Sequence, residues 1–254
     1  MGFVKTSEEI SAVQLLLARP RLERAEVLSL TVTTEASWLA RVLPPPLEPA
    51  GDTVRLAVGR WHGGCAGAHS GGGVYLPARF GGITGEYVLA MYMDSDASLV
   101  LGRTLFGEPK KLCRATLRRR DREVVGVLER YETPIVRLEA QLVEDLGPRV
   151  VLRRNFNVKA ELAPDGQGLQ YDPLLTVTEW RVLQRAESSG DGRADLASTP
   201  HDPLGTVPVG RVQRAAWAQS SMQGRCRTLA SIRADDFLPY AYGRLDDYVR
   251  HAAG

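Results

Sequence analysis

The interpretation of this sequence begins with one stretch, Gly102-Arg103-Thr104-Leu105-Phe106-Gly107-Glu108-Pro109-Lys110-Lys111-Leu112. Apolar residues precede it, so we predict a strand over 97–102. The chain then leaves the core in a turn and returns to the core at Leu112. Lysine is scarce elsewhere, because only four of the 32 Lys and Arg residues are Lys, and two of those four stand together here. The doublet is therefore the first place to look for chemistry.

A lysine differs from an arginine because its amine can lose a proton inside a protein, and only the unprotonated amine attacks a carbonyl. Burial in an apolar pocket, or a second cation nearby, favours the unprotonated form. Two interpretations of Lys110 and Lys111 stay open at this point. In the first interpretation, one lysine is a nucleophile and its neighbour modulates it. In the second, the two lysines are an exposed pair on a turn.

The charge balance argues against a partner held mainly by electrostatics. The chain has 32 Lys and Arg against 30 Asp and Glu, a net charge of +2. Basic residues do gather at Arg114, Arg118–Arg120 and Arg122. No aromatic residue is interleaved with them, which favours a solvated strand end or a subunit contact over nucleic acid. We expect no nucleic-acid partner.

The composition also indicates the cellular compartment in which we expect the protein. No stretch approaches 18 apolar residues, so we expect no membrane association. The cysteines Cys65, Cys113 and Cys226 are odd in number and far apart, which is typical of free thiols in a reducing compartment. The preference for Arg over Lys suggests a GC-rich bacterial genome. We predict a cytoplasmic, bacterial protein.

Local patterns predict a single α+β domain over residues 1–254, built on a large, mainly antiparallel sheet or barrel. Thr6 and Glu9 form a capping box that opens a helix ending before Pro20. A closing helix is expected from Asp235 to His251, with Pro239 and Gly243 interrupting its first half. Residues 186–195 are polar and Gly-rich, which predicts a flexible loop. Besides 27–33 and 97–102, the strand candidates are 53–59, 74–80, 86–93, 113–119, 123–131, 134–143, 150–160 and 173–184.

The stretch 102–112, with Gly85-Glu86-Tyr87 and Met91-Tyr92-Met93-Asp94 upstream, resembles the core of the acetoacetate decarboxylase family. The resemblance extends over roughly residues 20–250. It implies a cone-shaped barrel, a homo-oligomer and a reaction that needs no cofactor. It also implies that Lys110 forms an imine with the substrate ketone, and that Lys111 is the neighbour that helps to keep Lys110 neutral. Because adjacent residues on an extended segment point to opposite faces, Lys111 acts either by direct repulsion or by shaping the pocket.

The sequence departs from the family pattern, so it resembles a divergent member. The two usual active-site glutamates are replaced by Ala57 and Gly71, and Arg24 is only a weak match for the family arginine. Glu108 stands where the family usually has an aromatic residue. Two positions from Lys110 on extended backbone, it would share the face of that lysine.

Glu108 therefore has two interpretations. It is either a relocated general acid or base that serves the imine, or a solvated residue of the turn. An ionised Glu108 close to Lys110 would favour the charged amine, which implies a neutral Glu108 or an altered reaction.

Further candidates surround these residues. His69 and Ser70 border a vacated glutamate position and are expected to bind substrate, as are Tyr87, Tyr92 and Tyr240 by the resemblance. His62, Cys65 and His69 have a loose metal-ligand spacing without an evident fourth ligand, so we expect no metal.

These observations predict a lyase that forms a Schiff base with a small keto acid or ketone through Lys110. Decarboxylation is the reaction that the resemblance implies first. The missing glutamates leave open an aldolase, dehydratase or cyclase of specialised metabolism on the same fold. A non-catalytic small-molecule binding protein is the remaining alternative.

Overall fold

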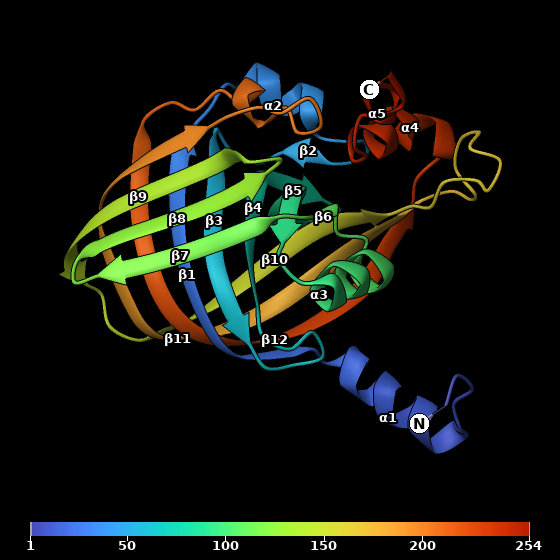
Figure 1. The fold of residues 1–254 in the computed structure, drawn as a ribbon, viewed down its shortest axis with the longest axis horizontal. Coiled ribbons are helices and arrows are strands. Elements are labelled where there is room, and N and C mark those ends of the chain that lie inside the picture. The colour runs from blue at the N-terminus through green and yellow to red at the C-terminus, as the bar shows by residue number, and fades with distance from the viewer. Residues whose placement is uncertain (1, 254) are drawn as a thin grey trace.

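The computed structural model describes residues 2–253, and its dominant element is one 12-stranded sheet (Figure 1). Part of the sheet closes on itself, because β10 pairs with both β5 and β11. The closed ring runs in the order β10, β5, β4, β3, β1, β12 and β11. Its strands are β1 (Arg21–Thr33), β3 (Thr53–His62), β4 (His69–Phe80), β5 (Ile83–Met93), β10 (Arg149–Lys159), β11 (Leu174–Leu196) and β12 (Val212–Ser231).

The pairing is mainly antiparallel, and the overall architecture confirms the predicted α+β fold on a large barrel-like sheet. Parallel pairs join β5 to β10 and β5 to the short β6 (Lys110–Leu112). The small strand β2 (Glu48–Pro49) pairs with β4. β-Sheets twist with a fixed hand, and this twist allows the ring of strands to close into a barrel with an inner and an outer face.

A second layer covers the outer face of the barrel. Strands β7 (Arg114–Arg120), β8 (Glu123–Arg130) and β9 (Thr133–Asp145) continue the sheet from β11 and cross in front of β1 and β3 (Figure 1). The main hydrophobic core lies between these layers, where Leu28 and Leu56 are fully buried together with Leu128 and Leu138. Gly126 lets β8 approach closely, because a Cβ atom there would lie 2.7 Å from Cβ of Val58.

The inner face carries the alternate residues of the same strands. Val27, Ser29 and Thr31 of β1 line a cavity there, while Leu28 and Leu30 between them belong to the outer core. This alternation follows from the two-residue period of a strand. The barrel therefore has a lumen, and the lumen is where the site lies.

Helices sit at the ends of the barrel. The capping box of Thr6 and Glu9 is confirmed, and it opens α1, which projects from the barrel with no buried residue (Figure 1). No helix within residues 2–253 has the length and apolar character needed to cross a membrane. The helices are α1 (Ser7–Ala18), α2 (Ala36–Val42), α3 (Asp96–Leu101), α4 (Ala234–Gly243) and α5 (Tyr248–Ala253), with a π-helical turn at Gly102–Phe106 and a 3₁₀ turn at Leu204–Thr206.

The structure corrects three local predictions. Residues 97–102 form helix α3 and the start of the π-helical turn, because the Ser95 side chain caps the helix by accepting from the amide of Ser98. The Gly-rich segment 186–195 is the end of β11, paired on both sides by β9 and β12. The closing helix is interrupted after Gly243 and forms two short helices, α4 and α5.

Candidate active site

The backbone before Lys110 brings its side chain back into the lumen. Helix α3 runs into the π-helical turn, and Gly107 ends that turn with a left-handed φ of 77°. A side chain at Gly107 would also collide with the backbone of Lys159, so glycine is required there. Strand β6 then places Lys110 beside Met91 of β5. π-Helical turns are often found at functional sites.

Lys110 is buried, with 8% of its surface exposed. Its Nζ atom donates to the carbonyl oxygen of Ser98 at 3.0 Å and to the Ser98 hydroxyl at 3.3 Å. It also lies 3.0 Å from Oε2 of Glu108, which is 7% exposed. The exposed-turn interpretation of both residues is therefore wrong, because the lysine and the carboxylate form a buried ion pair.

The Glu108 carboxylate is only partly satisfied. Its Oε2 atom is buried, and within residues 2–253 it has no hydrogen-bond donor of good geometry, so the contact with Lys110 is an ion pair rather than a hydrogen bond. An unused buried acceptor is costly unless something else binds it. Here the unused acceptor stands directly beside the amine.

Gly102 makes room for this pair. A Cβ atom at Gly102 would lie 2.6 Å from Nζ and from Cδ of Lys110 and would also collide with Glu108. No real side chain tolerates such contacts, so the first residue of the turn must be glycine for the ion pair to occupy this position.

Lys110 and Glu108 open into a cavity of about 120 Å³. Its other walls come from the barrel strands and the π-helical turn, and most are apolar or aromatic. They include Leu22, Trp61, His69, Tyr75, Met91, Met93, Phe106, Asn155, Trp180 and Met222. A small, largely apolar cavity with a few convergent polar groups is the usual form of a small-molecule site.

His69 is the predicted substrate-binding residue that reaches this cavity. Its ring stacks on Trp61 with 5.6 Å between centroids, and Nδ1 lies 3.2 Å from the Gly67 carbonyl oxygen. Burial lowers the pKa of His69, and the nearby charge of Lys110 lowers it further. The imidazole is therefore neutral at pH 7, which leaves it able to exchange a proton or a hydrogen bond with a bound molecule.

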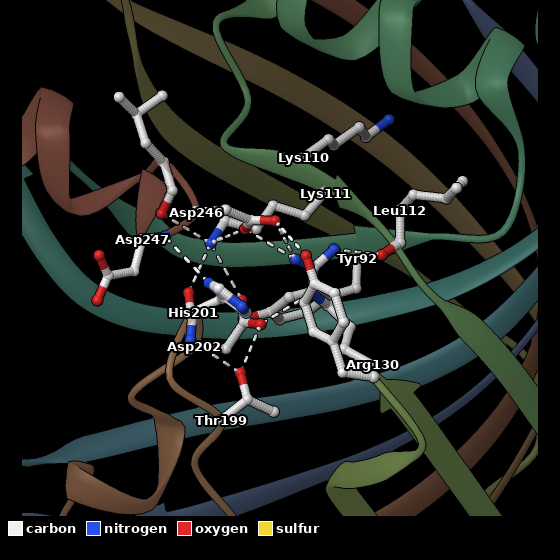
Figure 2. Close-up of polar contacts among 12 residues, drawn as sticks. Tyr92, Lys110, Lys111, Leu112, Arg130, Thr199, His201, Asp202, Asp246 and Asp247 are labelled. Carbon is white, nitrogen blue, oxygen red and sulfur yellow. Dashed lines mark hydrogen bonds and ion pairs between the residues drawn. The ribbon is translucent and has the colours of Figure 1, made fainter. Parts of the chain in front are cut away.

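Lys111 points the other way (Figure 2). Its Nζ atom donates to the carbonyl oxygens of His201 at 2.8 Å and Leu245 at 3.0 Å, and it pairs with Asp202 at 3.1 Å and Asp246 at 2.8 Å. Four oxygen partners hold the ammonium group on the opposite face of β6 from Lys110. Of the two roles left open for Lys111, this geometry favours shaping of the pocket, through the support of β6, over direct repulsion of the neighbouring amine.

The same carboxylates bind Arg130. Its guanidinium pairs with Asp202 at 2.8 Å and with Asp246 at 2.7 Å, and Tyr92 donates to Asp202 at 3.1 Å. Burial raises the pKa of Asp246, but hydrogen bonds from Lys111 and Tyr131 and the charges of Lys111 and Arg130 outweigh burial and hold that pKa well below its usual range. We call Lys111, Arg130, Asp202 and Asp246 the Lys111 network.

The other predicted substrate contacts lie outside the Lys110 cavity. Arg24 is exposed on β1, and the Ser70 amide donates to Asp94 at 2.7 Å. The Tyr87 hydroxyl accepts from Arg244 at 2.9 Å, Tyr92 serves the Lys111 network, and the Tyr240 ring stacks on Phe237. These positions do not favour contact with a ketone at Lys110.

The lost glutamate positions are structurally different from each other. Ala57 lines the lumen, so a longer side chain there would enter it. Gly71 lies against the backbone of Tyr92 so closely that even a Cβ atom would collide with it. This backbone thus cannot hold a glutamate at position 71 without moving β5.

Sequence reasoning missed several lining residues, notably Trp61, Tyr75, Ser98 and Trp180. The two-residue alternation within each strand could have marked them as one face, but only barrel closure shows which face points inward. Asn155 of β10 also lines the cavity. Its Oδ1 atom is buried in the lumen without a hydrogen-bond partner within residues 2–253.

The described part of the chain contains no group of three His, Cys, Asp or Glu side chains placed to hold a metal ion. The three cysteines are free. Burial raises the pKa of Cys113 to about 12, so its thiol is not ionised at neutral pH. The reactive side chains that line the cavity include the Lys110 amine, the Glu108 carboxylate, the His69 imidazole and the Cys65 thiol.

The sequence profile of the acetoacetate decarboxylase (ADC) family matches residues 4–232. Acetoacetate decarboxylase 1 of Bradyrhizobium diazoefficiens is 36% identical over 104 residues, which cover 41% of this chain and 42% of that protein. The acetoacetate decarboxylase of Burkholderia vietnamiensis is 29% identical over 196 residues, which cover 72% of this chain and 77% of that protein. The matches to the first relatives thus span less than half of their length.

Solved structures share the fold. Acetoacetate decarboxylase from Legionella pneumophila superposes with a TM-score of 0.75 at 19% identity, covering 84% of this chain and 87% of that one. The enduracididine biosynthesis enzyme MppR, solved in complex with pyruvate, superposes with a TM-score of 0.70 at 15% identity, covering 83% and 90%. At these identities the likeness concerns the fold.

Proposed function

The chain belongs to the acetoacetate decarboxylase family, and on that premise we propose that it is a lyase that forms a Schiff base between Lys110 and a small keto acid or ketone. The observation that carries the proposal is the buried contact of 3.0 Å between the Lys110 amine and the Glu108 carboxylate inside a closed lumen. Buried lysines are uncommon in proteins, and this one faces a cavity. The proposed reaction needs no metal or organic cofactor.

Glu108 gives the amine its reactivity in this proposal. Transfer of the ammonium proton from Lys110 to Glu108 leaves a nucleophilic amine and a carboxylic acid. The amine attacks the carbonyl carbon, a proton moves from its nitrogen to the carbonyl oxygen to give a neutral carbinolamine, and the new hydroxyl group takes a second proton from Glu108. Water then leaves with that oxygen, the nitrogen lone pair forms the C=N bond, and Glu108 is a carboxylate again.

The protonated imine is an electron sink. A bond to the neighbouring carbon can break because its electrons move into the imine as an enamine. If that bond leads to a carboxylate, the product is carbon dioxide, and decarboxylation is the reaction for which the family is named. The largely apolar lining of the cavity favours loss of the charged carboxylate.

A specific observation favours a second reaction class. Ala57 and Gly71 stand where the usual acids would be, and Glu108 is a proton acceptor beside the imine position. A base at that place removes a proton from the carbon next to the imine, which begins an aldol condensation or a dehydration. A fold relative, MppR, has been solved with the condensation product of pyruvate and imidazole 4-carboxaldehyde.

Reductive trapping tests the imine. Borohydride with pyruvate or acetoacetate, followed by intact mass measurement, should add the reduced substrate to the wild type and to Lys159→Arg but not to Lys110→Arg. Absence of an adduct from a panel of keto acids, or an adduct that survives in Lys110→Arg, would contradict the proposal.

Glu108→Gln separates the roles of the two residues. We expect turnover to fall about 10²- to 10⁴-fold, the usual contribution of a positioned acid or base, with a smaller change in KM. Carbon-13 product analysis of the wild type then distinguishes carbon dioxide release from carbon–carbon bond formation. Unchanged turnover of Glu108→Gln across pH would remove Glu108 from the mechanism.

The cytoplasmic location, the homo-oligomer and the role in specialised metabolism remain predictions from the sequence. Light scattering of the purified chain measures the oligomer directly, and a monomeric mass would contradict that prediction.

A further inference from the structure

A second cavity, of about 260 Å³, adjoins the Lys110 cavity inside the barrel. Trp61, Tyr75, Asn155 and Trp180 line both, so the two cavities are neighbouring compartments of one lumen. The proposed imine chemistry uses only the first. We call the second the arginine compartment, because Arg55, Arg149, Arg153 and Arg214 line it.

Three of these arginines are paired with carboxylates of the fold. Arg55 forms two hydrogen bonds of 2.7 Å with Glu86. Arg149 and Arg214 each lie 2.6 Å from Glu187, a buried carboxylate that the two guanidinium groups share. Two carboxylates thus serve three guanidinium groups, which leaves one positive charge in excess even before Arg153 is counted.

Arg153 is the remaining cation. Within residues 2–253, no carboxylate pairs with it and its guanidinium donates no hydrogen bond, whereas its neighbour Arg154 pairs with Glu179 on the other face of β10. The charge of Arg55, together with burial, lowers the pKa of Arg153 to about 10, so Arg153 is still charged at neutral pH. A partly buried charge without a partner is unfavourable, and an anion would relieve the cost.

The compartment also has the geometry to receive an anion from the Lys110 side. Asn155 lines both cavities, and Arg153 precedes it by two residues on β10, which is about 7 Å along a strand. Guanidinium groups bind carboxylates and phosphates with two parallel hydrogen bonds, so Arg153 suits an oxyanion.

We propose that the arginine compartment is a subsite for an oxyanion, the carboxylate or phosphate at the far end of an elongated substrate, and that Arg153 binds it. The inference rests on the proposed function only for the other end of that substrate, where the ketone meets Lys110. The substrate class is therefore an oxo acid or ketone with a second anionic group several carbons from the carbonyl. Pyruvate has no such group and fills only the first compartment.

Trapping with matched ligands tests the length of the substrate and the charge of its far group together. Borohydride adducts are measured against concentration for 2-oxoglutarate, 2-oxoadipate and 2-oxopimelate, each compared with the methyl ester of its far carboxylate, at constant ionic strength. We expect at least one free acid to reach half-saturation at about ten- to a hundredfold lower concentration than its ester, the usual range for a hydrogen bond to a charged group. Arg153→Gln should abolish that preference and leave pyruvate trapping unchanged.

Arg154→Gln is the control, because it removes the adjacent guanidinium on the outer face of β10. It should keep the preference, and Arg153→Lys should keep part of it. Thermal unfolding of each variant checks the fold, and we expect Arg153→Gln to unfold no earlier than the wild type because it removes an unpaired charge.

A second readout does not depend on the imine. Calorimetric titration with glutarate and with butyl phosphate, neither of which has a ketone, should show binding to the wild type and to Arg154→Gln but not to Arg153→Gln. The stronger of the two ligands identifies the oxyanion as carboxylate or phosphate. Failure of all keto acids to be trapped would contradict the proposed function alone, whereas equal binding to wild type and Arg153→Gln would contradict the subsite alone.

Discussion

At the scale of single residues, the site depends on where space is left as much as on which groups are present. Lys110 and Glu108 meet at 3.0 Å because Gly102 offers no side chain in the volume that they occupy. Ala57 and Gly71, the positions that the sequence resemblance matches to acids of the family, carry no carboxylate. The carboxylate enters instead from the segment that carries the lysine.

Gly102→Ala tests this dependence on space. The added methyl group would lie within 2.6 Å of the Lys110 amine, so we expect the lysine and Glu108 to be displaced and borohydride trapping to fall at least tenfold. Gly243→Ala is the matched control, because a Cβ atom there meets nothing within 4 Å. Equal trapping by both variants would show that the turn adapts without loss of the amine.

At the scale of elements, β6 is a strand of three residues that presents two lysines to two environments. One face supplies the amine to the lumen, and the other is held by the Lys111 network. A strand this short has few ladder hydrogen bonds of its own, so the network supplies much of what keeps it in place.

Lys111→Met should therefore act on stability. Its removal leaves Asp202, which is 1% exposed, with one cation in place of two. We expect the free energy of unfolding to fall by about 3 kcal/mol, the lower end for breaking a buried ion pair, since Arg130 remains. Urea unfolding measures it. Lys5→Met, which breaks an exposed pair with Glu9, should cost no more than roughly 0.5 kcal/mol, and equal losses would contradict the structural role of Lys111.

At the scale of the whole molecule, the Lys111 network ties the C-terminal segment to the barrel. Asp246 precedes helix α5 and binds Lys111 of β6 and Arg130 of β8, and Tyr131 donates to it at 2.8 Å (Figure 2). Thr199 and Asp202 bring in the segment before the 3₁₀ turn. A few charged side chains thus hold together segments that are far apart in the sequence.

Acid should loosen this connection. Because the pKa of Asp246 is below its usual value in the folded protein, the stabilisation is complete above about pH 4, the ordinary value for the unfolded chain, and is lost as the pH falls towards the folded value. In urea unfolding, the difference between wild type and Asp246→Asn should be largest at pH 7 and shrink by pH 3. The exposed Asp235→Asn should show no such trend. A difference that stays constant with pH would remove Asp246 from the acid response.

Local sequence was enough for some elements and misleading for others. The capping box at Thr6 and Glu9 and the strand over 27–33 depend on neighbouring residues, and the structure confirms both predictions. Residues 97–101 have an apolar run that suits a strand or a helix, and the cap at Ser95 decides for the helix. The Gly-rich end of β11 is a strand because β9 and β12 supply partners on both sides, which no local pattern reveals.

The sequence by itself determined that Lys110 and Lys111 face opposite ways, that Glu108 shares a face with Lys110, and that the chain resembles one family. These follow from the two-residue period of extended backbone and from ordered motifs. Only the tertiary structure decided which face of each strand points inward, because that depends on closure of the ring through β5, β10 and β11. Closure is also what buries the amine with its carboxylate, gives Lys111 its acidic partners, and leaves Arg153 in the lumen without one.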